Sequence, residues 1–204
     1  MLNTPLLYNF NPLNELLWLG ALLVSLPLAW LYWQQRHRTG LQRMQALRLL
    51  TLFLTFDLIL FGAFTRLTDS GLGCPDWPGC YGNSSPLGAQ LEIAAAQAVL
   101  PSGPVTHSKA WIEMLHRYLA MGVGALIVVM TLLSWRDWRL QRQAGYTPTD
   151  RIVHPGWATL TLVWVCLQGA LGALTVTMKL FPAIVTLHLA AASVLLALLA
   201  WQVA

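Results

Sequence analysis

The sequence contains little charge and few cysteines, and each shortage excludes a class of protein. Only 10% of its 204 residues are charged, whereas a soluble domain usually carries about a quarter, so a soluble protein is disfavoured. Three cysteines are too few for a disulfide-rich scaffold. The hydrophobic share of 56% and the mean hydropathy of +0.57 indicate a membrane protein instead. The ten tryptophans fit the membrane–water interface.

The positive charge does not indicate a nucleic-acid partner. The formal net charge is +4, but the arginines lie between apolar runs, where they orient a chain across a membrane. We therefore expect membrane lipid as a partner and no nucleic acid. The first apolar run lacks a preceding basic segment and a small-residue cleavage site, which disfavours a signal peptide.

Five apolar stretches approach the roughly 20 residues that a helix needs to cross about 30 Å of hydrocarbon. The sequence therefore predicts an all-α, polytopic transmembrane bundle of about five helices. The expected helices are 13–33, 48–66, 112–135, 156–177 and 183–203. A long, partly ordered outer loop is expected at 67–111, with a short amphipathic helix at 87–100.

Two connections between these helices are rich in arginine, and the positive-inside rule places both in the cytoplasm. The arginines are Arg36, Arg38, Arg43 and Arg48 in the first connection and Arg136, Arg139, Arg142 and Arg151 in the second. The N-terminus, the outer loop and the turn at 178–182 then face outward. In a bacterium, this arrangement predicts a multi-pass protein of the inner (cell) membrane.

Residues 65–82 combine two cysteines, two prolines, a tryptophan and several glycines. Pro lacks a backbone N–H and Gly is conformationally loose, so a helix ends here and a tightly shaped loop begins. Cys74 and Cys80 face the oxidising side of the membrane, which predicts a disulfide between them. That disulfide could be structural or could exchange with partner thiols. Cys166 is expected to be a small apolar core residue.

His116 and His188 each lie inside an apolar helix, whereas His37, His107 and His154 are expected in solvated positions. Ionisable groups in membrane helices are costly and tend to face the bundle interior, so the first two are functional candidates. A hydrogen bond to a neighbouring helix would explain each equally well. Their helices run in the same direction, and at ~1.5 Å per residue both histidines lie at a similar shallow depth. Such a pair could ligate a heme iron from opposite sides.

Three other ionisable residues accompany this pair. Glu113 shares a helix face with His116 and could orient the ligand, act as a base, or simply favour the start of the helix. Arg66 and Arg117 fall near the outer boundary, where they could pair with heme propionates or reach lipid headgroups. Asp57, midway along the second expected helix, could be protonated or hydrogen-bonded across the bundle.

The sequence also contains an internal echo. Residues 62–68 (GAFTRLT) end the second expected helix, and residues 172–177 (GALTVT) end the fourth. Each segment is followed by an outer connection and then by a helix that carries a histidine. This shared order predicts the duplication of a two-helix hairpin.

Several segments, in this order, resemble the heme A synthase family of membrane oxidoreductases. They are TRLTDSGLGCPDWPGC (65–80), EMLHR (113–117), LTVT (174–177) and IVTLH (184–188). The resemblance covers about 48–204. It implies oxidation of the C8 methyl group of heme O to a formyl group by successive hydroxylations, which supplies heme A to cytochrome oxidase.

The resemblance also implies roles for single residues. His116 and His188 would be the axial ligands of the substrate heme, Glu113 the catalytic carboxylate, and Cys74 with Cys80 the loop pair. It further implies heme O synthase and an electron donor as partners. A competing function is a non-catalytic membrane b-type cytochrome, which needs no acid beside its ligand. A small transporter or assembly factor, with the histidines as core residues, is a third.

Two features depart from the family's usual eight helices in two homologous halves, of which the second binds a heme b. The chain ends after its fifth helix, and residues 1–47 add a helix and a basic loop before the family region. We therefore expect 48–204 to form the N-terminal four-helix half. The chain would be a fragment, or half-size subunits would pair as a homo-oligomer.

Overall fold

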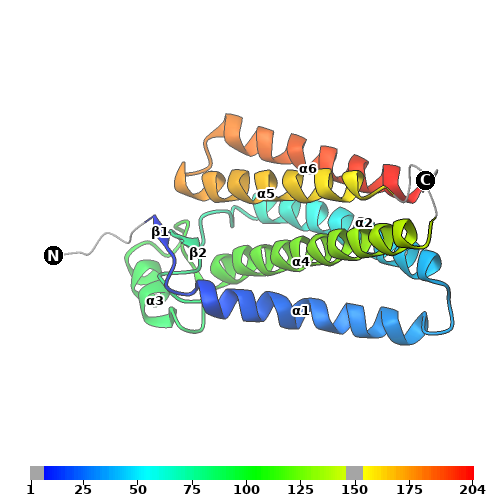
Figure 1. The fold of residues 1–204 in the computed structure, drawn as a ribbon. Coiled ribbons are helices and arrows are strands. Elements are labelled where there is room, and N and C mark those ends of the chain that lie inside the picture. Colours follow the sequence, from blue (N-terminus) through cyan, green and yellow to red (C-terminus); the bar gives the residue numbers. More distant parts are fainter. Residues whose placement is uncertain (1–6, 146–153) are drawn as a thin grey trace.

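The computed structural model describes residues 7–145 and 154–204, which form a bundle of long helices with a small cap at one end (Figure 1). The long helices are α1 (Leu13–Gln34), α2 (Gly40–Leu67), α4 (His107–Gln143), α5 (Pro155–Thr177) and α6 (Pro182–Val203). In the described part of the chain, these five are long and apolar enough to cross a membrane, which confirms the predicted fold class. The cap contains α3 (Gln90–Val99) and the strands β1 (Tyr8–Asn9) and β2 (Trp77–Pro78).

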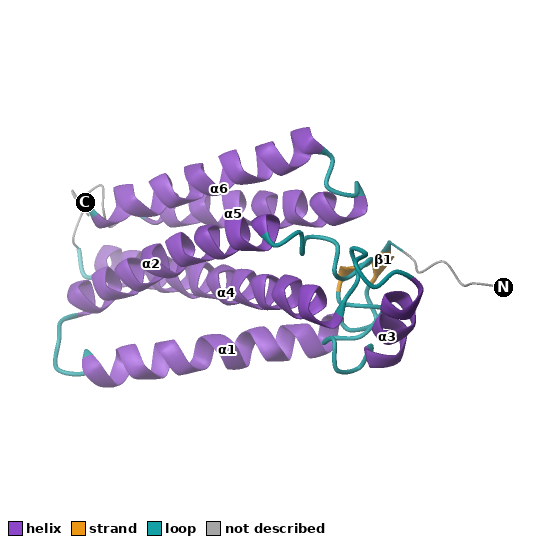
Figure 2. Ribbon diagram, turned by 180° about the vertical axis from the view of Figure 1, so that it is seen from behind, coloured by secondary structure: helices purple, strands orange, loops and turns teal. Residues whose placement is uncertain are grey.

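The helices form three layers, with α1 on one side, α2 and α4 in the middle, and α5 and α6 on the other side (Figures 1 and 2). α4 packs against α1, α2 and α5, and is therefore the central helix of the bundle. Buried apolar side chains fill the space between the layers. The most deeply buried are Leu47, Leu126, Ile127, Met130 and Leu199.

Polar capping residues set two helix starts that hydropathy placed too late. The hydroxyl of Thr39 accepts the N–H of Gln42, and the Gln42 side chain accepts the N–H of Thr39, so α2 begins with a capping box. At the start of α4, the hydroxyl of Thr106 accepts the N–H of Lys109. Both helices therefore extend beyond their apolar stretches. α3, by contrast, is shorter than the predicted 87–100.

Most of the arginines that the sequence placed in two connections lie on helices instead. Arg43 and Arg48 belong to α2, the described arginines of the second connection belong to α4, and Arg151 lies outside the described residues. Four arginines lie over aromatic rings: Arg36 over Trp33, Arg43 over Tyr32, Arg139 over Trp135 and Arg142 over Trp138. Basic and aromatic side chains together are typical of a membrane interface, and this end of the bundle is opposite the cap.

α2 and α5, the two helices of the sequence echo, end in the same backbone geometry. In each, the residue after the C-cap has a positive φ, 52° at Asp69 and 50° at Lys179. The next N–H then reaches back to an earlier carbonyl, which completes a Schellman motif. These bonds run from Ser70 to Thr65 (2.9 Å) and from Leu180 to Thr175 (2.8 Å). The echo in sequence therefore corresponds to an echo in structure.

The expectation for Cys166 is wrong, and one of the two alternatives for Asp57 is excluded. Cys166 is exposed on α5 and does not belong to the core. Asp57 is exposed on α2 and, within the described residues, is not hydrogen-bonded across the bundle.

α1 contributes to the cap as well as to the bundle, and this predicts a difference between two adjacent leucines. Leu16 is 1% exposed and packs with Cys74 and Cys80, whereas Leu17 is 64% exposed. Leu16→Ala should lower the free energy of unfolding by about 2–4 kcal/mol, because it leaves a cavity beneath the loop. Leu17→Ala, the matched control, should change it little. Titration with a denaturing detergent measures both, and equal values would contradict the packing described here.

Candidate functional site

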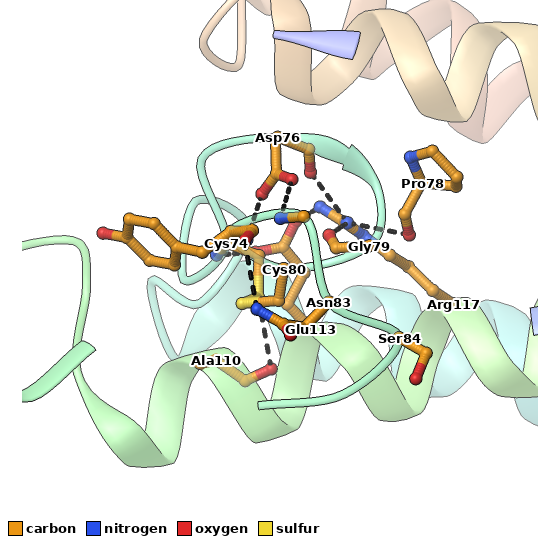
Figure 3. The surroundings of a disulfide bond; sticks show 12 residues. Cys74, Asp76, Pro78, Gly79, Cys80, Asn83, Ser84, Ala110, Glu113 and Arg117 are labelled. Atoms are coloured by element: carbon orange, nitrogen blue, oxygen red, sulfur yellow. Dashed lines mark hydrogen bonds and ion pairs between the residues drawn. A yellow bond between two sulfur atoms is a disulfide. The ribbon is translucent and has the colours of Figure 1, made fainter. Parts of the chain in front are cut away.

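The loop at the cap end of the bundle is closed by a buried disulfide (Figure 3). Cys74 and Cys80 are joined, with Cα atoms 4.9 Å apart, and neither residue is exposed. This confirms the predicted pair. The loop lies directly on the first turns of α4, since a β-carbon on Gly73 would come within 2.4 Å of the Lys109 carbonyl carbon. A glycine at position 73 is therefore required for this close approach.

The Asp76 side chain holds the loop together from inside. Its carboxylate accepts the backbone N–H groups of Tyr81 (2.5 Å) and Gly82 (2.7 Å), and the residue is 1% exposed. Burial, reinforced by the carboxylates of Asp76 and Glu92, raises the pKa of Tyr81, so its phenol stays protonated at neutral pH. The loop is therefore a preformed structure rather than a flexible connection.

Arg117 on α4 binds the same loop from below (Figure 3). Its guanidinium donates to the carbonyl oxygens of Asp76 (2.9 Å), Pro78 (3.2 Å) and Gly79, and it forms an ion pair with Glu113. Only 10% of the side chain is exposed. Arg117 thus points into the loop. The position near the membrane boundary was predicted from the sequence, but these four partners were not.

Glu113 joins the central helix to the disulfide. One carboxylate oxygen accepts the N–H of Cys74 (2.7 Å) and the other pairs with Arg117, one helical turn further on. The residue is 4% exposed. Sequence reasoning considered a role beside a heme and missed this anchoring role. The i, i+4 spacing of Glu113 and Arg117, which favours helical ion pairs, was the signal for it.

His116 on α4 and His188 on α6 lie below this loop, each against a glycine of another helix. A β-carbon on Gly62 of α2 would come within 3.0 Å of His116 Cε1, and one on Gly172 of α5 within 3.3 Å of His188 Cε1. The Phe61 ring stacks on the His116 imidazole, with the two ring centroids 6.3 Å apart. His116 therefore packs against the end of α2, and His188 packs against the end of α5.

The two histidines correspond in the glycines that they face and not in their distance from the starts of their helices. α4 begins earlier than expected, so the residue count from its start no longer equals that of α6. Instead, Gly62 and Gly172 occupy equivalent positions in the echo segments. Both Nδ1 atoms are buried and have no hydrogen-bond partner among the described residues.

The segment before α1 also reaches this site, which sequence reasoning did not predict. β1 pairs in parallel with β2 of the loop, Tyr8 with Trp77. The Tyr8 hydroxyl lies 3.2 Å from Thr177 Oγ1 at the end of α5. Within α1, Glu15 accepts the hydroxyl of Ser84 at 2.5 Å. The beginning of the described chain therefore ties the loop to α1 and α5.

The remaining candidates lie outside this cluster. Arg66 is exposed at the cap end of α2, which leaves its side chain accessible to headgroups or to a bound ligand. His37, His107 and His154 are exposed, as predicted. His154 also caps α5, because its Nδ1 accepts the N–H of Gly156 at 3.1 Å.

Five membrane-spanning helices that place two half-buried histidines beneath a disulfide-closed loop define a multi-pass membrane protein with a candidate site at one end. A model of the COX15-CtaA family, described as cytochrome oxidase assembly protein, matches residues 45–204. The chain belongs to this family, which confirms the resemblance drawn from its motifs.

Curated heme A synthases from several bacteria are similar to the chain. The protein from Shewanella oneidensis is 42% identical over 150 residues, which are 74% of this chain and 42% of that protein. Those from Lysinibacillus sphaericus and Rhizorhabdus wittichii are 27% and 29% identical, over 73% and 76% of this chain and 40% and 47% of their own lengths. The chain thus spans less than half the length of these relatives. No solved structure matches the chain significantly.

The contacts of Arg117 predict how firmly the loop protects its disulfide. Arg117→Lys keeps the charge but loses the planar set of donors that reaches three carbonyl groups. Hydrogen bonds of a charged group contribute about 1.5–3 kcal/mol each, so reduction of Cys74–Cys80 by an added thiol should be about tenfold faster or more. Alkylation followed by mass spectrometry measures the rate. Arg66→Lys, at an exposed arginine, is the control, and equal rates in all three proteins would refute the anchoring role.

Proposed function

We propose that this chain is the heme-binding, N-terminal half of a heme A synthase, which oxidises the C8 methyl group of heme O to a formyl group. The observation that carries this proposal is the pair His116 and His188, held against equivalent glycines beneath a closed loop. Family membership and the similarity to curated heme A synthases support the same function.

The residues present fit a heme. Two imidazoles on separate helices could serve as its axial ligands, and Phe61 adds an apolar ring beside one of them. In each histidine Nδ1 is buried, which leaves Nε2 as the nitrogen that could bind iron. Among the described residues, no cluster of three or more His, Cys, Asp or Glu side chains could hold a bare metal ion. Two imidazoles alone suit a metal that already has its equatorial ligands.

The substrate supplies the iron and the reacting methyl group, and the chain supplies position and charge. The apolar helices around the histidines exclude water, and the loop closes the site on the outer side. We assign the catalytic carboxylate to Glu113, one helical turn before His116. Arg66, exposed at the outer end of α2, would pair with a propionate; Arg117 is proposed to hold Glu113 and the loop in place.

The same geometry favours a second candidate. Both carboxylate oxygens of Glu113 already have partners in the loop, so its presence is explained without any chemistry. A membrane b-type cytochrome or heme-binding subunit that only transfers electrons would need no more than this. The two functions differ in whether the charge of Glu113 is needed for conversion of heme O.

The proposed reaction belongs to a protein longer than this chain, because the relatives extend well beyond the matched part. We propose that it needs a second half with its own heme b, or a second copy of this chain, and an electron donor. Heme O synthase would supply the substrate. The disulfide loop would lie on the outer face of a bacterial inner membrane, with the arginine-rich end in the cytoplasm.

Loss of either histidine should remove the heme. His116→Ala and His188→Ala each delete one proposed axial ligand, so the low-spin Soret spectrum of the purified chain should disappear or change to a high-spin form. His107→Ala, at an exposed histidine of the same helix, should leave the spectrum unchanged. If His116→Ala and His188→Ala both kept the low-spin spectrum, the heme assignment would be wrong.

Glu113→Gln separates the enzyme from the electron carrier. The amide keeps the size of the side chain and removes the charge, so heme should still bind while conversion of heme O to heme A fails or stops at the hydroxylated product. Hemes are extracted and identified by chromatography, in an assay that includes the second half. Arg117→Lys is the matched control, since it weakens the loop but retains the carboxylate. Normal heme A production by Glu113→Gln would leave Glu113 with its anchoring role alone.

A further inference from the structure

The two glycines that face the histidines have an unusual contact in common. At Gly62 the nearest atoms to an added β-carbon are Cε1, Nε2 and Nδ1 of His116, at 3.0, 3.6 and 3.7 Å. At Gly172 they are the same three atoms of His188, at 3.3, 3.9 and 4.0 Å. Each glycine therefore meets the same corner of an imidazole, between its two nitrogens, and in the same order of distance.

Most other glycines of the spanning helices do not make such contacts. An added β-carbon would meet no heavy atom within 4 Å at Gly122, Gly124 or Gly169. Gly169 lies on the same helix as Gly172, only three positions earlier. At Gly156 the β-carbon would meet the imidazole of His154, but that histidine is the N-cap of the same helix. Among these glycines, contact with a histidine of another helix is therefore a property of positions 62 and 172.

The echo between the two hairpins explains why the contact occurs twice. Gly62 and Gly172 each lie three residues before the threonine whose carbonyl closes the Schellman motif of its helix. In both cases the next spanning helix, α4 or α6, carries the histidine. The repeated order of helix end, outer connection and histidine thus builds two equivalent glycine–imidazole pairs.

We propose that Gly62 and Gly172 are positioning residues that set the planes of the two imidazoles, an inference that rests on the proposed heme site. A β-carbon at either position would touch Cε1 and turn the ring about its bond to the helix. Because Nδ1 of each ring is already enclosed, the ring has little room to turn without displacing other atoms. The angle between the two ligand planes determines the electronic structure of a low-spin iron, so the glycines act on the heme through the histidines.

The test compares Gly62→Ala and Gly172→Ala with Gly169→Ala in the full 204-residue chain loaded with heme. Both positioning variants should shift the electron paramagnetic resonance signal of the oxidised low-spin iron and weaken heme binding about tenfold. The shift should be larger for Gly62→Ala, because its β-carbon would lie closer to the ring. Gly169→Ala should match the unaltered chain in both measurements.

The outcomes separate this inference from the proposed function. If His116→Ala and His188→Ala keep the low-spin signal, the heme site itself is wrong. If those two lose the signal while both glycine variants behave like Gly169→Ala, only the positioning role is overturned. If Gly62→Ala does not assemble, removal of the ring in Gly62→Ala/His116→Gly should restore a helical, monodisperse protein. Failure of that double variant to assemble would also overturn the inference.

Discussion

The ion pair between Glu113 and Arg117 is the interaction on which the cap end of the molecule depends. These two residues belong to the central helix, and between them they bind four backbone groups of the disulfide loop. Two charges of opposite sign are buried together, so each offsets the cost of desolvating the other. Without either partner, the loop would have a buried, uncompensated charge beneath it. The position of the loop over the histidines therefore follows from an electrostatic requirement of α4.

Much of the fold could be predicted from the sequence because the bilayer imposes simple rules. Helix number followed from apolar length, and the disulfide followed from the side of the membrane on which Cys74 and Cys80 were predicted to lie. The helix starts could not be predicted in this way, since hydropathy does not register the capping of α2 by Thr39. Cys166 was placed wrongly for a related reason: in a membrane, the surface of a bundle is apolar, so hydropathy does not separate inside from outside.

The candidate site was predictable in its residue types but not in its contacts. Two histidines in apolar helices are rare enough to be noticed, and their chemistry restricts what they can bind. Glu113 accepts the N–H of Cys74, which lies thirty-nine positions earlier in the chain. This hydrogen bond depends on the path of the loop, and no local sequence pattern encodes that path. The role of Gly62 likewise depends on which helix packs beside α4. Such pairings are properties of tertiary packing rather than of any segment.

The strand that precedes α1 has a consequence for the order in which the protein assembles. The disulfide closes a short loop of nearby residues, and this step needs only the chain as far as α2 and the segment after it. The Tyr8–Thr177 contact, in contrast, joins residues 169 positions apart. Contacts of such long range form late, and during synthesis this one must wait until α5 has been inserted. The cap is therefore completed in two stages: β1 can pair with β2 once the loop has been made, whereas the Tyr8 hydroxyl meets Thr177 only after α5 is in place.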